Sequence, residues 1–352
     1  MSASGGPAPA LVGILYDFPQ ADGGKLFEDA LRLGMEAAHR SFDRPVELLA
    51  VHARGLPSGS AHEIGQGFEQ LAGAGVLAVV GPSISDNALV AQPLTDAHQL
   101  PTINYSGGER TRGAYMFHYQ VGSLQEEPVV LAAHLAQRRL QTVALAHDRS
   151  AVGRGYAEAF VESCARHGID VVSSAALSPL SQDVASVIGR LRAAEPQCLC
   201  YLGLGVAARA LALAVLDEKW DVPVVANSAL MFGYAQKEWR AGWDGWTYVD
   251  TVSDANPVRA ALKQLSSYIA AGPIGVAAYD MGRLLGEAFE RADHLTRQGV
   301  RQGLESVKAL PAASGAPGTV MGFGPWDRGA LKGPYLVLRS WRDGRTVELQ
   351  PE

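Results

Sequence analysis

Short apolar runs alternate with longer amphipathic segments along most of the chain. In its first third, runs rich in Val, Leu and Ile predict buried strands, and the segments of helical period between them predict helices. The predicted strands cover residues 11–17, 46–53, 76–82 and 100–106, and the predicted helices cover 25–40, 62–72 and 86–98. Parallel strands buried on both faces read as near-continuous apolar runs, so this alternation predicts a parallel sheet covered by helices.

The same alternation restarts after the stretch YMFHYQVGS at 115–123. The second set of predicted strands covers 142–148, 169–177, 197–205 and 222–228, with helices at 125–138, 155–167, 183–193 and 206–216. Three more predicted helices follow at 257–271, 276–292 and 300–310, and then a β-rich tail in which Asp343-Gly344 predicts a hairpin. The predicted fold class is therefore α/β, with two similar lobes built one after the other.

Size and charge agree with two soluble domains. The chain has 352 residues, whereas a typical domain has about 150. With 47% hydrophobic residues and a net charge of −6, the composition suits a globular protein and disfavours contact with nucleic-acid phosphates or acidic lipids. The longest apolar windows, at 71–80 and 197–206, are much shorter than the ~18 residues of a membrane span. We therefore expect no nucleic-acid partner and no membrane insertion.

The cysteines and histidines do not predict a metal site. Of three cysteines, only Cys198 and Cys200 lie close together, in an apolar run where positions two apart share one face of a strand. This pattern is typical of buried free thiols. A Cys-x-Cys metal site would need further Cys or His ligands nearby, and the nine histidines are scattered without such spacing. We expect neither a metal nor a cofactor.

Three stretches resemble catalytic or cofactor motifs but lack a required residue. Ser83 and Ser85 lie in GPSISD, which has no closing glycine of a hydrolase nucleophile elbow. No Walker string appears. The stretch GLGVAA at 203–208 follows a predicted strand, yet the next strand ends in Asn227 and Ser228 rather than in the acid of a dinucleotide site. A tight strand-to-helix turn is the simpler interpretation of GLGVAA, and an enzyme is disfavoured.

Small polar residues instead gather at the carboxyl ends of predicted strands, where open α/β sheets bind ligands. Helix starts at these ends offer backbone N–H groups and the positive end of a dipole, which suit a small anion or polar head. No paired carboxylates and no Ser/His/Asp order join them, so we expect binding rather than chemistry. The residues are Ser83, Ser85, Ser106-Gly107-Gly108, Ser150 and Ser228.

At this point the sequence resembles the type I periplasmic solute-binding proteins of the branched-chain amino-acid kind, which serve ABC transporters. GPSISDNALVAQPLTDAHQLPTIN is similar to that family's Gly-Pro-x-x-Ser, Ala-x-x-Pro and Pro-x-Ile pattern. GPIGVAAYDMGRLLGEAFERA resembles its aromatic-bearing helix, and GTVMGFGPWDRGALKGPYLVLRSWRDGRTVEL resembles its closing stretch. The resemblance runs from about Leu11 to the end of the chain.

The resemblance implies a periplasmic binding protein type I fold: two Rossmann-like lobes with parallel sheets, joined by a three-strand hinge, that close on a ligand in the cleft. The N-terminal lobe would hold residues 1–120 plus 252–328. The C-terminal lobe would hold residues 121–251 plus 329–352.

The resemblance also implies ligand-binding positions. The serine that grips a carboxylate falls on Ser85, and the next loop's contacts fall on Ser106 and Gly108, where the family's usual Thr hydroxyl is absent. The acid that grips an ammonium falls on Ser228, and a cleft aromatic falls on Val152. Another aromatic position in the first loop is Asp22, and three aromatic residues near strand ends would line an apolar wall or pack in the core: Tyr16, Phe18 and Tyr105.

The loss of the acid at Ser228 predicts the ligand class. A buried ammonium without a carboxylate costs several kcal/mol, so an ordinary amino acid should bind poorly unless Asp22 or Asp17 replaces the acid. We therefore expect a small organic acid or amide with an apolar or aromatic body in preference to leucine, isoleucine or valine.

Two functional classes fit these expectations. One is a solute receptor for an ABC permease, placed in the periplasm or outside the cytoplasmic membrane by the resemblance. The other is a cytoplasmic sensor that regulates another protein, like the amide sensor of the same superfamily. The N-terminal stretch MSASGGPAPALVGILYD has no basic region and no sustained apolar region, so it carries no secretory signal as given. Either a signal was removed or the protein is cytoplasmic.

Overall fold

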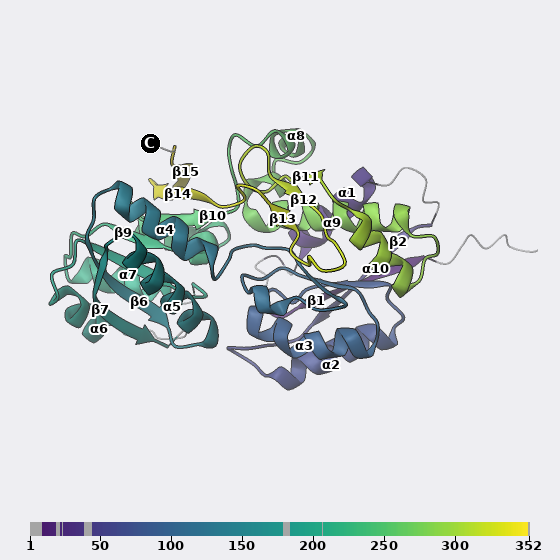
Figure 1. The fold of residues 1–352 in the computed structure, drawn as a ribbon, viewed down its shortest axis with the longest axis horizontal. Coiled ribbons are helices and arrows are strands. Elements are labelled where there is room, and N and C mark those ends of the chain that lie inside the picture. Colours follow the sequence, from purple (N-terminus) through teal and green to yellow (C-terminus); the bar gives the residue numbers. More distant parts are fainter. Residues whose placement is uncertain are drawn as a thin grey trace, which may run out of the picture. The chain divides into compact units, whose positions relative to one another are not determined.

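The computed structural model describes residues 9–18, 22, 24–38, 44–178, 184–205 and 207–350. The chain divides into two compact units and passes between them three times (Figure 1). Unit 1 holds Met1–Val121 and Ala255–Tyr335, and unit 2 holds Gly122–Asp254 and Leu336–Glu352. The third passage thus follows Tyr335 rather than residue 328, because 310–332 pairs into a small sheet that belongs to unit 1.

Unit 1 contains a five-stranded, wholly parallel sheet. Its strands are β1 (Ala10–Tyr16), β2 (Val46–His52), β3 (Ala78–Val80), β4 (Thr102–Asn104) and β5 (Met116–His118). They lie in the order β2-β1-β3-β4-β5. In this doubly wound order the chain first adds β2 on one side of β1 and then continues on the other side. The reversal between β1 and β3 is the point where such sheets open a ligand crevice at their carboxyl ends.

Helices cover both faces of this sheet. Successive residues of β1 point to opposite faces: Leu15 packs in a core with Phe68, whereas the Tyr16 ring contacts that of Phe27, 5.9 Å away between centroids. Phe68 belongs to α2 (Ala61–Gly73), and α3 (Ser85–Ala97) packs beside α2. Phe27 belongs to α1 (Lys25–Ala38). The remaining helices of this unit are α8 (Pro257–Leu265), α9 (Pro273–Arg291) and α10 (Arg297–Ser306).

Helices α1 and α9 approach each other closely because glycines face one another at their crossing. A Cβ on Gly34 of α1 would collide with the carbonyl oxygen of Tyr279, and one on Gly282 of α9 would collide with that of Leu31. The two backbones are therefore in direct contact, which only residues without a side chain allow. This crossing joins the N-terminal segment of unit 1 to a helix encoded more than two hundred residues later.

Arg297 makes a second long-range connection within unit 1. Its guanidinium donates to the carbonyl oxygens of Val76 (3.0 Å), His98 (3.1 Å) and Ala72 (2.7 Å). Ala72 lies in the last turn of α2 and His98 caps α3. Carbonyls at helix ends lack intrahelical partners, and a cation there also complements the helix dipoles.

Unit 2 contains a seven-stranded sheet that repeats the strand order of unit 1. Its strands are β6 (Thr142–Asp148), β7 (Asp170–Leu177), β8 (Cys198–Leu202), β9 (Val224–Ala226), β10 (Thr247–Asp250), β14 (Val337–Arg342) and β15 (Arg345–Glu348). The parallel part runs β7-β6-β8-β9-β10, and β14 and β15 extend it antiparallel. Between β14 and β15 the hairpin predicted at Asp343-Gly344 is confirmed, with φ values of 50° and 68° that suit the tight turn.

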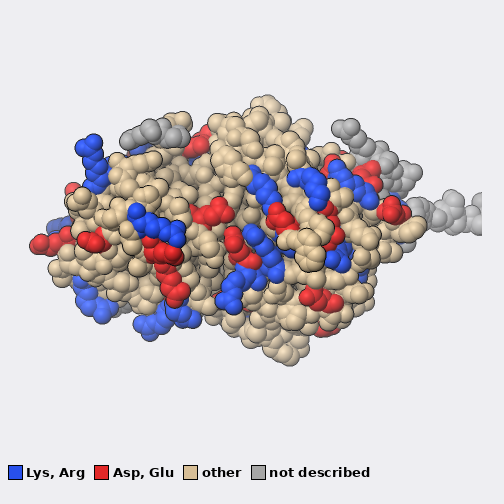
Figure 2. Space-filling model, in the orientation of Figure 1, with Lys and Arg blue, Asp and Glu red and all other residues tan. Residues whose placement is uncertain are grey.

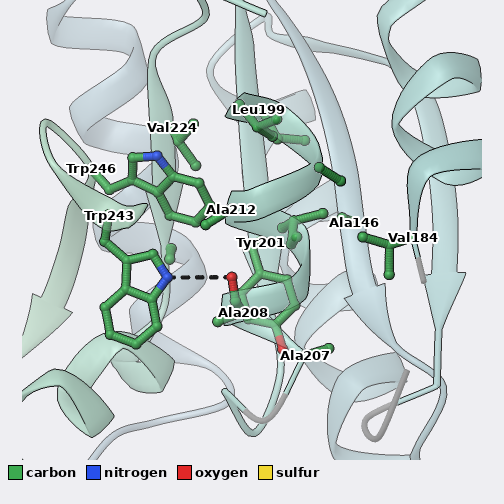
Figure 3. Close-up of a cluster of buried hydrophobic side chains, with 14 of the residues drawn as sticks. Ala146, Val184, Leu199, Tyr201, Ala207, Ala208, Ala212, Val224, Trp243 and Trp246 are labelled. Carbon is green, nitrogen blue, oxygen red and sulfur yellow. Dashed lines mark hydrogen bonds between the residues drawn. The ribbon is translucent and has the colours of Figure 1, made fainter. Parts of the chain in front are cut away.

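The side chains of β8 show how the sheet of unit 2 separates two cores. Leu199 and Tyr201 face the core beneath α6 (Ala185–Arg192) and α7 (Ala208–Asp217). That core also contains Trp243, whose indole donates to the Ala208 carbonyl over 3.3 Å (Figure 3). Cys198 and Cys200 face the other core, beneath α4 (Glu126–Gln137) and α5 (Ala151–Arg166). The prediction of buried free thiols on one strand face is confirmed.

Three expectations about secondary structure need correction. Helix α5 begins at Ala151 rather than at 155, because the Ser150 side chain caps it by accepting from the Gly153 N–H. The predicted helix 257–271 ends at Leu265 and is followed by a short 3₁₀ turn, Ile269–Ala271. The sequence did not predict the small antiparallel sheet of unit 1, which consists of β11 (Leu310–Pro311), β12 (Val320–Met321) and β13 (Leu331–Lys332).

The α1–α9 crossing gives a test with an internal control. Gly34→Ala should lower the free energy of unfolding by about 1–3 kcal/mol, because the added methyl group forces the helices apart. Gly65→Ala, in the middle of α2 with nothing within 4 Å of its added Cβ, should raise stability by about 0.5–1 kcal/mol. Urea unfolding of both variants measures the difference. Equal effects would mean that α1 and α9 are not in backbone contact.

Candidate functional site

A buried carboxylate organises the carboxyl end of the unit 1 sheet. Asp17 follows β1 directly and is 2% exposed. Its oxygens accept from the Ser83 N–H (2.8 Å), the Ser83 hydroxyl (2.6 Å), the Ile84 N–H (2.9 Å) and the Asn87 amide (2.9 Å). Burial raises the pKa of Asp17, and these hydrogen bonds oppose that rise. With four donors around it, Asp17 fixes the β3–α3 loop and is not placed to replace a missing ligand acid.

Ser85 differs from its neighbours in having an uncommitted hydroxyl. It is the first residue of α3 and is 7% exposed, yet in the described part of the chain no hydrogen bond involves its side chain. Ser83, by contrast, donates to Asp17, and Ser106 donates to the Asn104 side-chain oxygen over 2.8 Å. Of these three predicted serines, Ser85 therefore keeps its hydroxyl proton for another acceptor.

Gly108 lies directly against Ser85. A Cβ on Gly108 would be 2.8 Å from the Ser85 hydroxyl oxygen and 2.9 Å from its Cβ, so a threonine cannot occupy this position without displacing Ser85. The structure thus brings the predicted residues Ser85 and Gly108 together. It also gives a steric reason for the absence of the threonine.

The predicted aromatic wall of unit 1 is mostly core. Tyr16 is 1% exposed and stacks on His52, with ring centroids 4.8 Å apart. Tyr105 is 3% exposed and packs on Phe27, at 5.0 Å between centroids. Only Phe18 among the three predicted residues is partly exposed. Contact of Tyr16 or Tyr105 with a ligand remains a prediction, and packing in the core is what the structure describes.

Asp22 caps the start of α1. Its carboxylate accepts from the N–H groups of Gly24 (3.0 Å) and Leu26 (2.8 Å) and from the Tyr268 hydroxyl (2.9 Å). Burial raises the pKa of Asp22, but the hydrogen bonds from Leu26, Tyr268 and Gly24 outweigh it and the net shift is downward. This set of partners is typical of a capping carboxylate rather than of one held ready for an ammonium.

Unit 2 repeats the organising carboxylate of unit 1. Asp148 ends β6 and accepts from the Leu204 N–H (2.6 Å) and the Tyr201 hydroxyl (2.9 Å). It thereby holds the loop after β8, as Asp17 holds the loop after β3. Val152, the position where the resemblance implies a ligand contact, is 4% exposed and packs in the core beneath α4 and α5.

Ser228 is joined to a buried acid that the sequence analysis missed. The carboxylate of Glu127, in the first turn of α4, accepts from the Ser228 N–H (2.6 Å) and hydroxyl (3.2 Å). It also accepts from the Ser123 N–H (2.7 Å) and the Tyr156 hydroxyl (2.7 Å). The expectation that this end lacks a carboxylate is therefore wrong. The acid comes from a helix about a hundred residues earlier in the chain.

Part of this arrangement has a local sequence signal. Ser123 accepts from the Glu126 N–H over 3.0 Å, while Glu127 accepts from the Ser123 N–H, which is close to a reciprocal capping box. A serine followed three and four residues later by glutamates predicts that cap. Nothing local predicts the contact with Ser228, because it depends on how β9 and α4 pack together.

Three further features of the described residues are the distribution of surface charge, the placement of metal-ligating side chains and the hydropathy of the helices. On the face drawn in Figure 2, basic and acidic side chains are interspersed rather than gathered by sign. Within the described residues, no group of three His, Cys, Asp or Glu side chains is placed to hold a metal ion. None of the described helices is both long and apolar enough to cross a membrane.

Doubly wound α/β units with polar groups at the carboxyl ends of their strands, connected by three chain crossings, are typical of type I periplasmic binding proteins. The chain belongs to the periplasmic binding protein family, whose sequence profile matches residues 11–342.

Solved structures agree with this fold. One is a leucine-binding protein from Thermotoga maritima MSB8, with a TM-score of 0.84 and 14% identity over 97% of this chain and 98% of that one. Another is an ABC transporter substrate-binding protein from Desulfitobacterium hafniense in complex with Leu, with a TM-score of 0.78 and 19% identity over 97% and 100% of the two chains. At these identities the likeness shows the fold alone. No protein of curated function matches the chain.

The buried acid of unit 2 makes stability depend on pH. Burial raises the pKa of Glu127 from 4.5 to about 7, despite the hydrogen bonds that favour its ionised form. The folded state therefore binds a proton more tightly than the unfolded state, and this group's contribution to stability falls as pH rises from about 4.5 to about 7. Between about pH 5 and pH 8, wild type should lose about 2–3 kcal/mol relative to Glu127→Gln, which does not titrate.

Tryptophan fluorescence during urea unfolding measures this difference, because five of the six tryptophans lie in unit 2. A parallel pH dependence in wild type and Glu127→Gln would show that Glu127 titrates at its ordinary value.

Proposed function

We propose that this chain is a non-enzymatic receptor that binds a small organic acid, amide or amino-acid-like solute and delivers it to the permease of an ABC importer. The observation that carries this proposal is the uncommitted Ser85 hydroxyl at the start of α3, beside Gly108. Family membership and the leucine-binding and substrate-binding proteins of similar fold support it.

The energetics favour an oxygen-bearing group at this place. The Ser85 hydroxyl is free to donate, and its net contribution on binding is about 0.5–1.5 kcal/mol for a neutral acceptor and about 1.5–3 kcal/mol for a charged one. The N-terminal end of α3 adds N–H groups and about half a positive charge, which attract a carboxylate or a carbonyl oxygen. The solute therefore presents an oxygen to Ser85.

The same surroundings disfavour catalysis. In the described part of the chain the Ser83 proton goes to Asp17, which three further donors hold in place, and no base contacts Ser85. A serine nucleophile needs a base within hydrogen-bond reach, with a third group to orient that base. Neither serine has this arrangement, so both are suited to holding a group rather than attacking it.

Removing the Ser85 hydroxyl tests the receptor function. Thermal-shift measurements with aliphatic amino acids, aromatic and short-chain carboxylates and amides first identify a solute that stabilises the protein, since a ligand of the folded state raises its stability. Ser85→Ala should then weaken binding of that solute about 5- to 150-fold by calorimetry, the equivalent of about 1–3 kcal/mol. Its stability without solute should change little.

Ser163→Ala is the matched control, because the Ser163 hydroxyl donates only to the Ala159 carbonyl of its own helix in the described structure. Its dissociation constant should equal that of wild type. An unchanged constant in Ser85→Ala, or a panel in which no solute stabilises the protein, would argue against the receptor proposed here.

A further inference from the structure

Most edge strands of the described sheets are protected against pairing with another chain. An exposed edge presents N–H and C=O groups, and soluble proteins protect it with charges, bulges, short strands or covering segments. In unit 2, β7 has a bulge where its pairing with β6 skips Val172, and β15 has four residues that include Arg345 and Glu348. In unit 1, β5 has three residues, and the His118 N–H and carbonyl are bonded to the segment Arg328–Ala330 over 2.8 Å.

The other edge of the unit 1 sheet, β2, has none of these features in the described part of the chain. Its seven residues, VELLAVH, pair with β1 in unbroken register along their whole length. The strand contains no proline and no lysine, and Glu47 is its only acid. Leu48, Leu49 and Ala50, in its centre, are partly exposed. This strand is therefore an open edge with an apolar middle.

Hydrogen bonds at the two ends of β2 show which of its backbone groups face away from β1. The Ala10 N–H donates to the Pro45 carbonyl, and the Ala53 N–H donates to the Tyr16 carbonyl, both over 2.8 Å. Alternate residues of a strand direct their N–H and C=O groups to the same side, so the odd-numbered residues from 45 to 53 use theirs on β1.

The even-numbered residues of β2 therefore direct their backbone groups outward. Among the hydrogen bonds between described residues, only one reaches these groups, from the Arg32 guanidinium to the Val46 carbonyl over 3.4 Å. The outward-facing residues are Val46, Leu48, Ala50 and His52.

A second copy of β2, running antiparallel, matches this pattern when Leu49 lies opposite the partner's Leu49. Each outward-facing residue then meets another, and such residues exchange both N–H···O bonds, so every outward N–H and C=O group gains a partner. No two charges of one sign are opposed, and apolar side chains meet in the centre. The other opposed pairs are Leu48 with the partner's Ala50, Val46 with the partner's His52 and Glu47 with the partner's Val51.

We propose that β2 is the surface through which two copies of this chain pair, so that two unit 1 sheets join across a two-fold axis at Leu49. The strand carries its own complement, which is what a symmetric dimer contact requires. This assembly goes beyond the proposed receptor function, and either can hold without the other. One pair of strands is a small contact, so the fraction of dimer should rise with protein concentration.

Sedimentation velocity of the full-length protein at increasing concentration tests for the dimer. The test variant is Ala50→Pro, because an edge strand tolerates proline where the missing N–H faced away from the sheet. The proline removes one intermolecular donor from each copy, so the dissociation constant should rise at least about fivefold. Ala50→Val, which keeps the N–H and suits a strand, should dimerise like wild type.

Cysteine cross-linking locates the contact even if Ala50→Pro does not fold. In Leu49→Cys the two thiols would face each other in a pair without hydrogen bonds, where Cα atoms lie about 4.5 Å apart and a disulfide can form. Glu47→Cys, on the same strand face, is the matched control, because its two thiols would lie about 14 Å apart. Mild oxidation should join copies of Leu49→Cys only. The three native cysteines are buried and do not compete.

The proposal is overturned if wild type stays monomeric at every concentration, if a folded Ala50→Pro dimerises as tightly as wild type, or if the two cysteine variants cross-link equally. A monomeric protein whose Leu49→Cys variant cross-links to a different protein rather than to itself would assign this edge to a foreign strand, which also overturns it.

Discussion

The arrangement of each unit depends on a buried carboxylate at the end of the first strand of its sheet. Asp17 in unit 1 and Asp148 in unit 2 each accept a main-chain N–H from the loop that follows the neighbouring strand. Loops at the carboxyl ends of a buried sheet have N–H groups that no ladder satisfies, and buried N–H groups need partners. A carboxylate satisfies several at once with charge-assisted bonds. The position of Ser85 at the start of α3 follows from this constraint.

The two units share a topology but carry different polar groups. Ser106 lies two residues beyond β4 and Ser228 two residues beyond β9, so the serines occupy equivalent places in equivalent sheets. Ser106 donates to the neutral amide of Asn104, whereas Ser228 donates to the acid Glu127. The shared strand order thus places these two serines at equivalent positions of the two sheets. The side chain that accepts from each serine differs: the neutral Asn104 lies next to Ser106, and the acid Glu127 lies next to Ser228.

The alternation of apolar runs was enough to predict the two α/β units. Strands buried on both faces form continuous apolar runs, and helices with one apolar face repeat apolar residues every three to four positions. The small sheet β11–β13 was missed since strands of two residues have no period. At the site, Ser85 was expected beside a helix start, and it is the first residue of α3. Glu127 was missed because its contact with Ser228 arises from packing between elements far apart in the chain.

The same long-range packing governs how the chain is made. The glycine face of α1 packs on α9, but residue 273, where α9 begins, is synthesised 235 residues after residue 38, where α1 ends. At about 5–20 residues per second, the ribosome needs on the order of tens of seconds to cover this distance. During that time α1 has no α9 to pack on, and most of unit 2 emerges first. The growing chain therefore exposes the apolar face of α1, which α9 does not yet cover, and chaperones can bind that face. Slow translation between the two helices would prolong the exposure.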